Sequence, residues 1–418
     1  MKIAAIIAEY NPFHKGHAYH IAQTKEITSC DYCIIIMSGN YVQRGTPAIF
    51  NKRARTAMAL SCGADLVLEL PLSYSCASAN HFAGGAIDIA NALGCITHLS
   101  FGCENANADL FYQIADILNQ EPPLFKESLQ KNLKAGLSFP KARQEALLTL
   151  LRAQKSLKNE DFSLITSFFS SPNNLLGLEY IRFLKETKSS ITPVFITRQG
   201  AGYHEKGLDF SFISASGLRQ SIFSDYPHNF SFESFKNFVP KETYKLYEEE
   251  FSNRGPLHPD DFSLLLKYRL MSLNQNLYSN YLDVSPFLAQ KIENQLNDFT
   301  SWTEFCHLLK SKDLTFGRIQ RSLLHILLSI DEPYAPCYLR PLGFRRSARP
   351  LLGKIKETAS LPLLSKLPDN KTTLTFSQKD KDKLQTNLLA DNLYESLVSM
   401  KYKSPFVHER SQSIVILD

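Results

Sequence analysis

The chain begins with MKIAAIIAEYNPFHKGHAYH (residues 1–20), an apolar run followed by a turn that carries two histidines. The run Ile3–Ala8 is short and is closed by an Asn-Pro pair, which predicts a buried strand. The Ala, Ile, Gln and Lys pattern after Gly16 predicts a helix, so His14 and His17 are expected on the turn between strand and helix. Helix N-termini favour phosphate, and two imidazoles there can donate hydrogen bonds to a phosphate whose charge grows during a reaction. The alternative is a pair of polar turn residues with no ligand.

Length and composition describe an ordinary globular protein. The 418 residues suffice for two or three domains, and the fractions of 44% apolar and 21% charged residues are typical of such proteins. The sequence has no run of about 18 uncharged apolar residues, so no membrane span is expected. Its start is typical of a strand rather than of a signal peptide, and its eight scattered cysteines are not a disulfide framework. We therefore expect a cytoplasmic protein.

Strands and helices alternate after the opening turn. Apolar runs predict four further strands, at residues 31–37, 66–70, 96–101 and 191–197. With helical patterns between them, this order predicts an α/β fold, a Rossmann-like doubly wound parallel sheet. Ligands of such sheets bind at the carboxyl ends of the strands. Three polar turns fall at such ends and can meet in one crevice, at residues 9–17, 38–45 and 102–105.

A second anion site is predicted where residues 213–219, ISASGLR, lead into a helix. Ser216 lies at the helix start and Arg219 lies one turn further on, so a hydroxyl, free N–H groups and a guanidinium can share one face. Arg44 and Lys52 are further cations in or near the predicted turns. For each of these cations the alternative is a solvated surface position.

From about residue 225 the pattern becomes helical and rich in Phe, Tyr and Leu, which predicts a catalytic domain at 1–224 and a mainly helical region at 225–418. Residues 318–366 contain nine basic and three acidic residues, a net charge of +6 against +5 for the whole chain. Cations with interleaved aromatic residues suit phosphates and unstacked bases, while the alternative is a solvated helical surface. The candidate RNA contacts are Arg318, Arg321, Arg345, Arg346 and Arg349.

The H-x-G-H turn resembles the signature of the nucleotidyltransferase superfamily that shares the HIGH motif with class I tRNA synthetases. Seven motifs together resemble one family within it, the bacterial tRNA(Met) cytidine acetate ligases. They are EYNPFHKGH (9–17), MSGN with QRG (37–45), KRAR (52–55), DLVLELP (65–71), SPNNLLG (171–177), ISASGLR (213–219) and TFGRIQR (315–321). The resemblance covers nearly the whole chain, with the motifs in the same order and at similar spacing.

The resemblance implies a nucleotidyltransferase-type domain that binds ATP and a C-terminal region that binds tRNA. It implies an enzyme, a ligase, that activates acetate with ATP to acetyl-adenylate. The acetyl group then passes to N4 of the wobble cytidine of elongator tRNA(Met), giving N4-acetylcytidine. ATP is then a cosubstrate. Whether a Mg²⁺ ion accompanies it is left open. The resemblance implies no metal held by the protein, no membrane and no protein partner.

The family's site residues correspond to particular positions here. The catalytic pair is His14 and His17. The ATP-binding stretch corresponds to Ile7, Ala8, Glu9, Tyr10, Asn11, Pro12, Phe13, His14, Lys15, Gly16, His17, Ala18, Tyr19 and His20. Further ATP contacts are implied for Gly102, Asn173 and Arg198, and candidate phosphate contacts are Ser216 and Arg219. Gly217 departs from the pattern, because a β-branched residue is commoner there, which puts the geometry of the helix cap in doubt.

Two other functions compete with this one. The first is a cytidylyl- or adenylyltransferase that acts on a small metabolite. It needs no nucleic acid and leaves the C-terminal region unexplained. The second is a nucleotide-binding regulator without turnover, and the intact pair of His14 and His17 argues against it.

Overall fold

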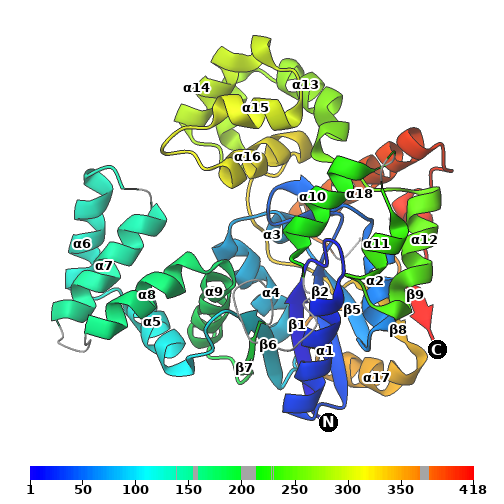
Figure 1. The fold of residues 1–418 in the computed structure, drawn as a ribbon, viewed down its shortest axis with the longest axis horizontal. Helices are drawn as coiled ribbons and strands as arrows, with labels where there is room; N and C mark the ends of the chain where they lie inside the picture. The colour runs from blue at the N-terminus through cyan, green and yellow to red at the C-terminus, as the bar shows by residue number, and fades with distance from the viewer. Residues whose placement is uncertain (138, 154–158, 199–212, 227, 229, 368–375) are drawn as a thin grey trace. The chain divides into compact units, whose positions relative to one another are not determined.

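The computed structural model describes residues 1–137, 139–153, 159–198, 213–226, 228, 230–367 and 376–418 (Figure 1). The chain forms two compact units, the first made of Met1–His98 with Gln199–Asp418 and the second of Leu99–Arg198. Unit 1 therefore contains residues from both sides of the predicted boundary at 224/225. No helix in these described ranges is long and apolar enough to cross a membrane.

Unit 1 is built on a sheet whose first three strands are parallel. These strands are β1 (Ile3–Ala8), β2 (Tyr32–Ser38) and β5 (Leu66–Leu70), in that spatial order. Their apolar side chains are almost all buried, as expected for strands covered on both faces. Since Ala8 pairs with Met37, β1 and β2 end at the same edge of the sheet. The predicted fold class, a doubly wound parallel sheet with helices followed by a mainly helical region, is confirmed.

Two strands that the sequence pattern did not predict extend this sheet beyond β5. β8 (Pro341–Arg345) runs antiparallel to β5, and β9 (Val415–Leu417) runs parallel to β8. Both belong to the C-terminal region. β8, with the sequence PLGFR, contains a proline and a glycine, which interrupt a strand pattern, and β9 has only three residues, too few for a periodicity.

Helices and a small hairpin connect the strands of unit 1. They are α1 (Lys15–Thr28), the hairpin of β3 (Tyr41–Val42) and β4 (Thr46–Pro47), α2 (Lys52–Ser61), α3 (Leu72–Ser75) and α4 (Ala79–Leu93). The side chain of Asn51 caps α2 by accepting a hydrogen bond from the Ala54 N–H. Gly94 ends α4 at φ 65°, where a Cβ would meet the Thr358 carbonyl oxygen at 2.4 Å, so only glycine fits.

The C-terminal part of unit 1 adds nine described helices: α10 (Ala215–Asp225), α11 (Phe232–Lys236), α12 (Tyr244–Asn253), α13 (Ser263–Ser272), α14 (Pro286–Gln295), α15 (Trp302–Leu309), α16 (Phe316–Leu328), α17 (Arg349–Thr358) and α18 (Gln378–Tyr402). Phe235 and Tyr247 pack into the core of β1, β2 and α2. Helices α13 to α16 gather into one group (Figure 1), and the core around the buried Trp302 also includes Ala390, Tyr394 and Val398 of α18. Short 3₁₀ helices are Lys241–Thr243, Pro259–Phe262, Gln275–Asn280, Leu296–Asp298, Arg346–Ala348 and Glu409–Ser411.

The described residues of unit 2 contain five helices, one whole strand, and all of a second strand except its first residue, His98. They are β6 (His98–Cys103), α5 (Ala108–Gln120), α6 (Pro123–Lys134), α7 (Phe139–Ala153), α8 (Asn159–Ser170), α9 (Pro172–Glu186) and β7 (Thr192–Thr197). β7 lies beside β6. A cluster of aromatic rings, Phe101, Phe111, Phe168 and Phe195, forms its core.

Candidate active site

The two histidines lie on the strand-to-helix turn as the sequence predicts. His14 is the N-cap of α1, and its Nδ1 accepts a hydrogen bond from the Gly16 N–H at 3.0 Å. The Nδ1 of His17 accepts from the His14 N–H at 3.2 Å, and the two rings stack with centroids 3.7 Å apart. Because each Nδ1 accepts from a backbone N–H, each neutral ring carries its proton on Nε2. The turn therefore presents two imidazole N–H donors at a helix N-terminus.

The residues before His14 fix the shape of the turn. Tyr10 has φ 51° and places its ring against Phe13 and His17, with centroids 4.8 Å from each. The Phe13 carbonyl accepts from Tyr247, and Asn11 Oδ1 accepts from the Ile49 N–H at 2.8 Å. Within the predicted ATP-binding stretch, residues 10–14 are buried and residues 15–20 are partly exposed. The buried residues of the string EYNPF therefore pack beneath the turn and support it.

Two arginines converge beside this turn. Arg44, from the loop between β3 and β4, donates to Ser216 Oγ at 3.1 Å, and Arg219 donates to the same oxygen at 3.3 Å and to the Asn11 carbonyl. Burial lowers the pKa of Arg219, and the positive charge of Arg44 lowers that pKa further. Two cations that share one hydroxyl repel each other, so an anion bound between them would be stabilised. The structure thus brings together Arg44, Ser216 and Arg219, which the sequence predicts from separate motifs.

The helix that carries Ser216 and Arg219, α10, has a side-chain N-cap although residue 217 is a glycine. Ser214 Oγ accepts from the Gly217 N–H at 3.2 Å and so begins α10. A Cβ on residue 217 would lie 2.9 Å from the Ile213 side chain. Glycine therefore fits the local packing, and the departure from the family pattern leaves an ordinary N-cap.

Arg55 is the residue of the site that sequence reasoning missed. It is fully buried, and its Nε donates to the Phe50 carbonyl at 3.0 Å. Its Nη1 donates to the carbonyls of Glu9 at 2.6 Å and Ser38 at 3.0 Å, and its Nη2 donates to that of Gly39. Burial lowers the pKa of Arg55 to about 10. One guanidinium thus joins the carboxyl ends of β1 and β2, and the KRAR motif is the only sequence signal for it.

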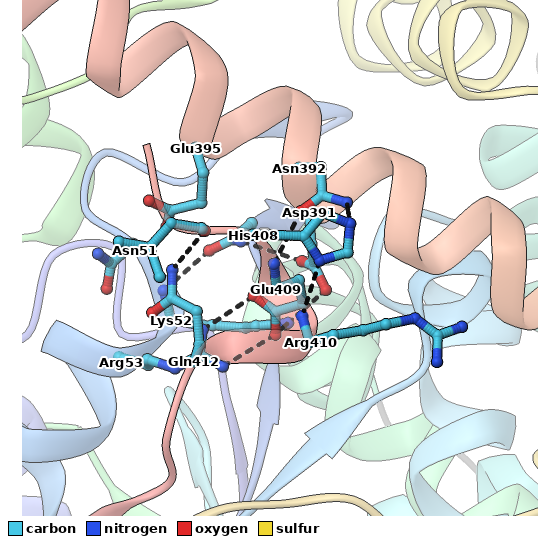
Figure 2. Close-up of polar contacts among 12 residues, drawn as sticks. Asn51, Lys52, Arg53, Asp391, Asn392, Glu395, His408, Glu409, Arg410 and Gln412 are labelled. Atoms are coloured by element: carbon cyan, nitrogen blue, oxygen red, sulfur yellow. Dashed lines mark hydrogen bonds and ion pairs between the residues drawn. The ribbon is translucent and has the colours of Figure 1, made fainter. Parts of the chain in front are cut away.

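Lys52 is enclosed by protein carboxylates and does not face an open anion position. Its Nζ lies 2.7 Å from Glu69, 2.6 Å from Asp391 and 3.1 Å from Glu409, and its side chain is 0% exposed. Arg340 pairs with the same three acids. Figure 2 shows Lys52 and Arg53 from α2 beside Asp391 of α18 and Glu409 near the C-terminus. The prediction that Lys52 holds an anion is therefore wrong, and so is the alternative of a solvated surface position, because this network encloses the side chain and uses its charge.

In unit 2, the candidate ATP contacts gather around Glu104. The Arg198 N–H donates to the Cys103 carbonyl at 3.0 Å, and a Cβ on Gly102 would lie 3.2 Å from Arg198 Cγ. The Asn173 amide donates to Glu104 Oε1. The side chain of Arg198 is exposed. Gly102, Asn173 and Arg198 are thus neighbours within this unit, although they come from separate segments.

The five candidate RNA-binding arginines lie in two segments of the chain. On α16, Arg321 pairs with Asp283 at 3.0 Å, and Arg318 donates to the Asp283 carbonyl at 3.4 Å. The other three lie at the end of β8 and directly after it. Of these, Arg345 donates to the Leu60 carbonyl, whereas Arg346 and Arg349 are exposed, with Arg346 paired to Asp418 at 2.7 Å. Of the five candidate arginines, Arg346 and Arg349 are therefore the exposed ones. Among the described residues, no group of three or more His, Cys, Asp or Glu side chains could hold a metal ion.

A parallel sheet with an H-x-G-H turn after its first strand is the arrangement expected of a HIGH-motif nucleotidyltransferase. Comparison with known proteins agrees with this class. The family model described as HIGH Nucleotidyl Transferase matches residues 1–409. A tRNA(Met) cytidine acetate ligase of Halothermothrix orenii is 37% identical over 416 residues, which cover 97% of this chain and 96% of the relative. A protein of the same name from Acetivibrio thermocellus is 36% identical over the full length of both chains. The crystal structure of Thermotoga maritima TmcAL bound with alpha-thio ATP superposes with a TM-score of 0.88, at 28% identity and with 100% of both chains covered.

The chain therefore belongs to the tRNA(Met) cytidine acetate ligase family of HIGH nucleotidyl transferases.

Proposed function

We propose that this protein is an ATP-dependent ligase that acetylates N4 of the wobble cytidine of elongator tRNA(Met), through an acetyl-adenylate. The observation that carries the proposal is the pair of imidazoles whose Nδ1 atoms are held by backbone N–H groups. This hydrogen bonding turns both Nε2–H groups into donors at the start of α1. Family membership supplies the substrates, because the relatives are named for tRNA(Met), cytidine and acetate.

In the first step, an acetate oxygen attacks the α-phosphorus of ATP, and the bond to the β-phosphate oxygen breaks to release pyrophosphate. Such a reaction needs positioning and charge neutralisation more than a covalent nucleophile. His14 and His17 donate to the α-phosphate as its charge grows. The Arg44–Ser216–Arg219 group holds the departing phosphates.

In the second step, N4 of the cytosine attacks the carbonyl carbon of acetyl-adenylate. The bond from that carbon to the phosphate oxygen breaks, AMP leaves, and N4 loses a proton. The protein's task in this step is to bring the base to the adenylate and to exclude water, which would otherwise hydrolyse it.

The remaining assignments rest on the family and on local geometry. We assign residues 1–224 to catalysis and residues 225–418 to tRNA binding, with Arg346 and Arg349 as the most exposed of the candidate RNA contacts. In unit 2, Gly102, Asn173 and Arg198 are proposed contacts of ATP on the resemblance alone. All eight cysteines are free thiols, which suits a cytoplasmic location.

Two assays test this function. With ATP, acetate and labelled pyrophosphate but no tRNA, the protein should catalyse acetate-dependent exchange of pyrophosphate into ATP. With tRNA(Met) added, mass spectrometry of nucleosides should find N4-acetylcytidine. Exchange that depends on a different acid or a small metabolite, with no change in the tRNA, would favour the small-metabolite transferase and reject the proposed function.

A further inference from the structure

A pocket in unit 1 opens at the carboxyl ends of β2 and β5. Its walls include Asn40 just after β2, Glu69 of β5, Tyr334 and Tyr338 from the segment before β8, and Asn387 and Asp391 from α18. Ligands of doubly wound sheets bind at this edge. The histidine turn follows β1, whereas this pocket lies at the ends of the next two strands of the sheet, β2 and β5.

The buried guanidinium of Arg55 links the wall of the pocket to the residue that begins the histidine turn. Gly39, which lines the pocket, and Glu9, which begins the EYNPFHKGH string, both have carbonyls that accept from the Arg55 guanidinium. Two carbonyl oxygens that accept hydrogen bonds from the same guanidinium must lie close together. A group in the pocket is thus next to the strand end from which the histidine turn starts.

The hydrogen bonds within the pocket show which of its polar groups can act as donors and which as acceptors. Tyr334 Oη donates to Asn387 Oδ1 at 2.9 Å, which directs the Asn387 Nδ2 donors elsewhere. Asp391 Oδ1 accepts from Asn40 Nδ2 at 3.0 Å and has a second lone pair. Asn387 and Asp391 are four residues apart, so they lie one above the other on the same face of α18. The pocket therefore offers a donor and an acceptor side by side, together with aromatic rings.

Charge excludes a carboxylate ligand such as acetate from this pocket. Arg340 is the only cationic residue among the pocket's described lining, and Glu69 lies 2.8 Å from its guanidinium, with Asp391 and Glu409 as its other partners. An added anion would meet the carboxylates of Glu69 and Asp391 without a free cation. A neutral ring with an amino donor and a ring acceptor meets no such penalty.

We infer that this pocket receives the cytosine ring that is to be acetylated, turned out of the anticodon stack. The inference rests on the proposed function and names the place of its acceptor substrate. Carboxylates are the usual acceptors for the cytosine amino group, so Asp391 would take the N4 hydrogen and Asn387 would donate to O2 or N3 of the ring. Tyr334 and Tyr338 supply the aromatic surfaces on which unstacked bases are held.

The test separates the two half-reactions. Asn387→Asp keeps the shape of the side chain and an acceptor for Tyr334, but it replaces the amide donor by a carboxylate oxygen. Acetyl transfer to tRNA(Met) should then fall at least about tenfold in kcat/KM, the scale of one lost hydrogen bond to a buried partner. Acetate-dependent pyrophosphate exchange should stay within about twofold, and the KM for acetate should not change. Gln385→Glu, an exposed position two residues away on α18, makes the same change in charge and should alter neither reaction.

A second variant guards against local damage. Cys337→Trp places a large ring at a half-buried position of the pocket wall and should block transfer while exchange continues. Normal transfer in both variants would overturn the inference, as would a raised KM for acetate or an equal loss of both half-reactions, because the pocket would then serve activation. If the wild-type protein neither exchanges pyrophosphate with acetate nor acetylates tRNA, the proposed function itself fails, which is a different result.

Discussion

Two ring nitrogens decide what the histidine turn can do. The sequence predicts where His14 and His17 lie, because strand, turn and helix signals follow one another within twenty residues. It does not predict their tautomers. These follow only from the capping box, in which the Nδ1 of each ring accepts a backbone N–H. The same contacts that begin α1 therefore direct the two Nε2–H donors.

His17→Ala should lower acetate-dependent pyrophosphate exchange by about 10²-fold, the scale for losing one preorganised donor to a transition state. The variant also loses the acceptor for the His14 N–H, at a cost of about 1 kcal/mol in the free energy of unfolding. Thermal unfolding measured beside the exchange rate separates the two effects. A folded variant that exchanges at the wild-type rate would remove His17 from the mechanism.

A buried carboxyl group gives the folded protein a pH dependence away from the site. Burial raises the pKa of Glu250, on α12, to about 7. Because the folded protein holds this proton more tightly than the unfolded chain does, the resulting stabilisation is complete below about pH 4.5 and is lost as the pH rises through 7. The free energy of unfolding from this group should therefore decrease by up to about 3 kcal/mol across that window.

Glu250→Gln keeps the side chain neutral and should remove this decrease. Urea unfolding at pH 5 and pH 8 measures it: the wild type should lose stability between the two values, and the variant should lose clearly less. Glu249→Gln removes the same charge from an exposed neighbour on α12, whose charge adds only a minor part to the raised pKa of Glu250, and should keep most of the wild-type decrease. Equal pH dependence in all three proteins would contradict the assignment.

Among the elements, α2 links the site to the rest of the fold. At its start, Arg55 holds the ends of β1 and β2, while Lys52 and Arg53 reach the carboxylates of Asp391 and Glu409 (Figure 2). Sequence patterns predict α2 and the strands, since these depend on local periodicity. They do not predict the ion network, because two of its three acids, Asp391 and Glu409, lie more than 300 residues away from Lys52, and nothing local marks the pairing.

Arg55→Lys should show that the guanidinium, and not only its charge, is required. An ammonium has three donors on one atom and cannot span four carbonyls, so at least one buried carbonyl loses its partner at about 1–3 kcal/mol. Pyrophosphate exchange should fall with it, because the turns after β1 and β2 are no longer held together. Arg53→Lys, two residues earlier on α2, keeps its charge beside Glu409 and should cost less in both measurements. Equal behaviour of the two variants, measured by denaturant unfolding and exchange, would argue against this role of Arg55.

Across the whole molecule, the two ends of the chain complete one unit. β8 and β9 come from the C-terminal region, yet they extend the sheet that contains β1. The same region supplies Arg340, Asp391 and Glu409 to the buried network. The sequence predicts a helical C-terminal region with a local positive charge. The positive charge counted from the sequence is larger than the charge that reaches the surface, because Arg340 is enclosed by carboxylates and Arg321 is paired with Asp283. Burial decides which charges reach solvent, and composition cannot show burial.

The exposed part of that charge leads to the last prediction. Arg346 and Arg349 are exposed after β8, and each phosphate that such a cation neutralises releases counterions, so tRNA affinity should fall steeply with salt. The double variant Arg346→Glu with Arg349→Glu should bind tRNA(Met) more weakly and flatten the logarithmic salt dependence by about 0.7–0.9 for each lost phosphate contact. Lys354→Glu with Lys356→Glu reverses the same number of charges on α17 and reports the effect of net charge alone. Gel-shift titrations at several salt concentrations measure both the affinity and the slope. If the two double variants gave the same affinity and slope, tRNA would bind at another surface.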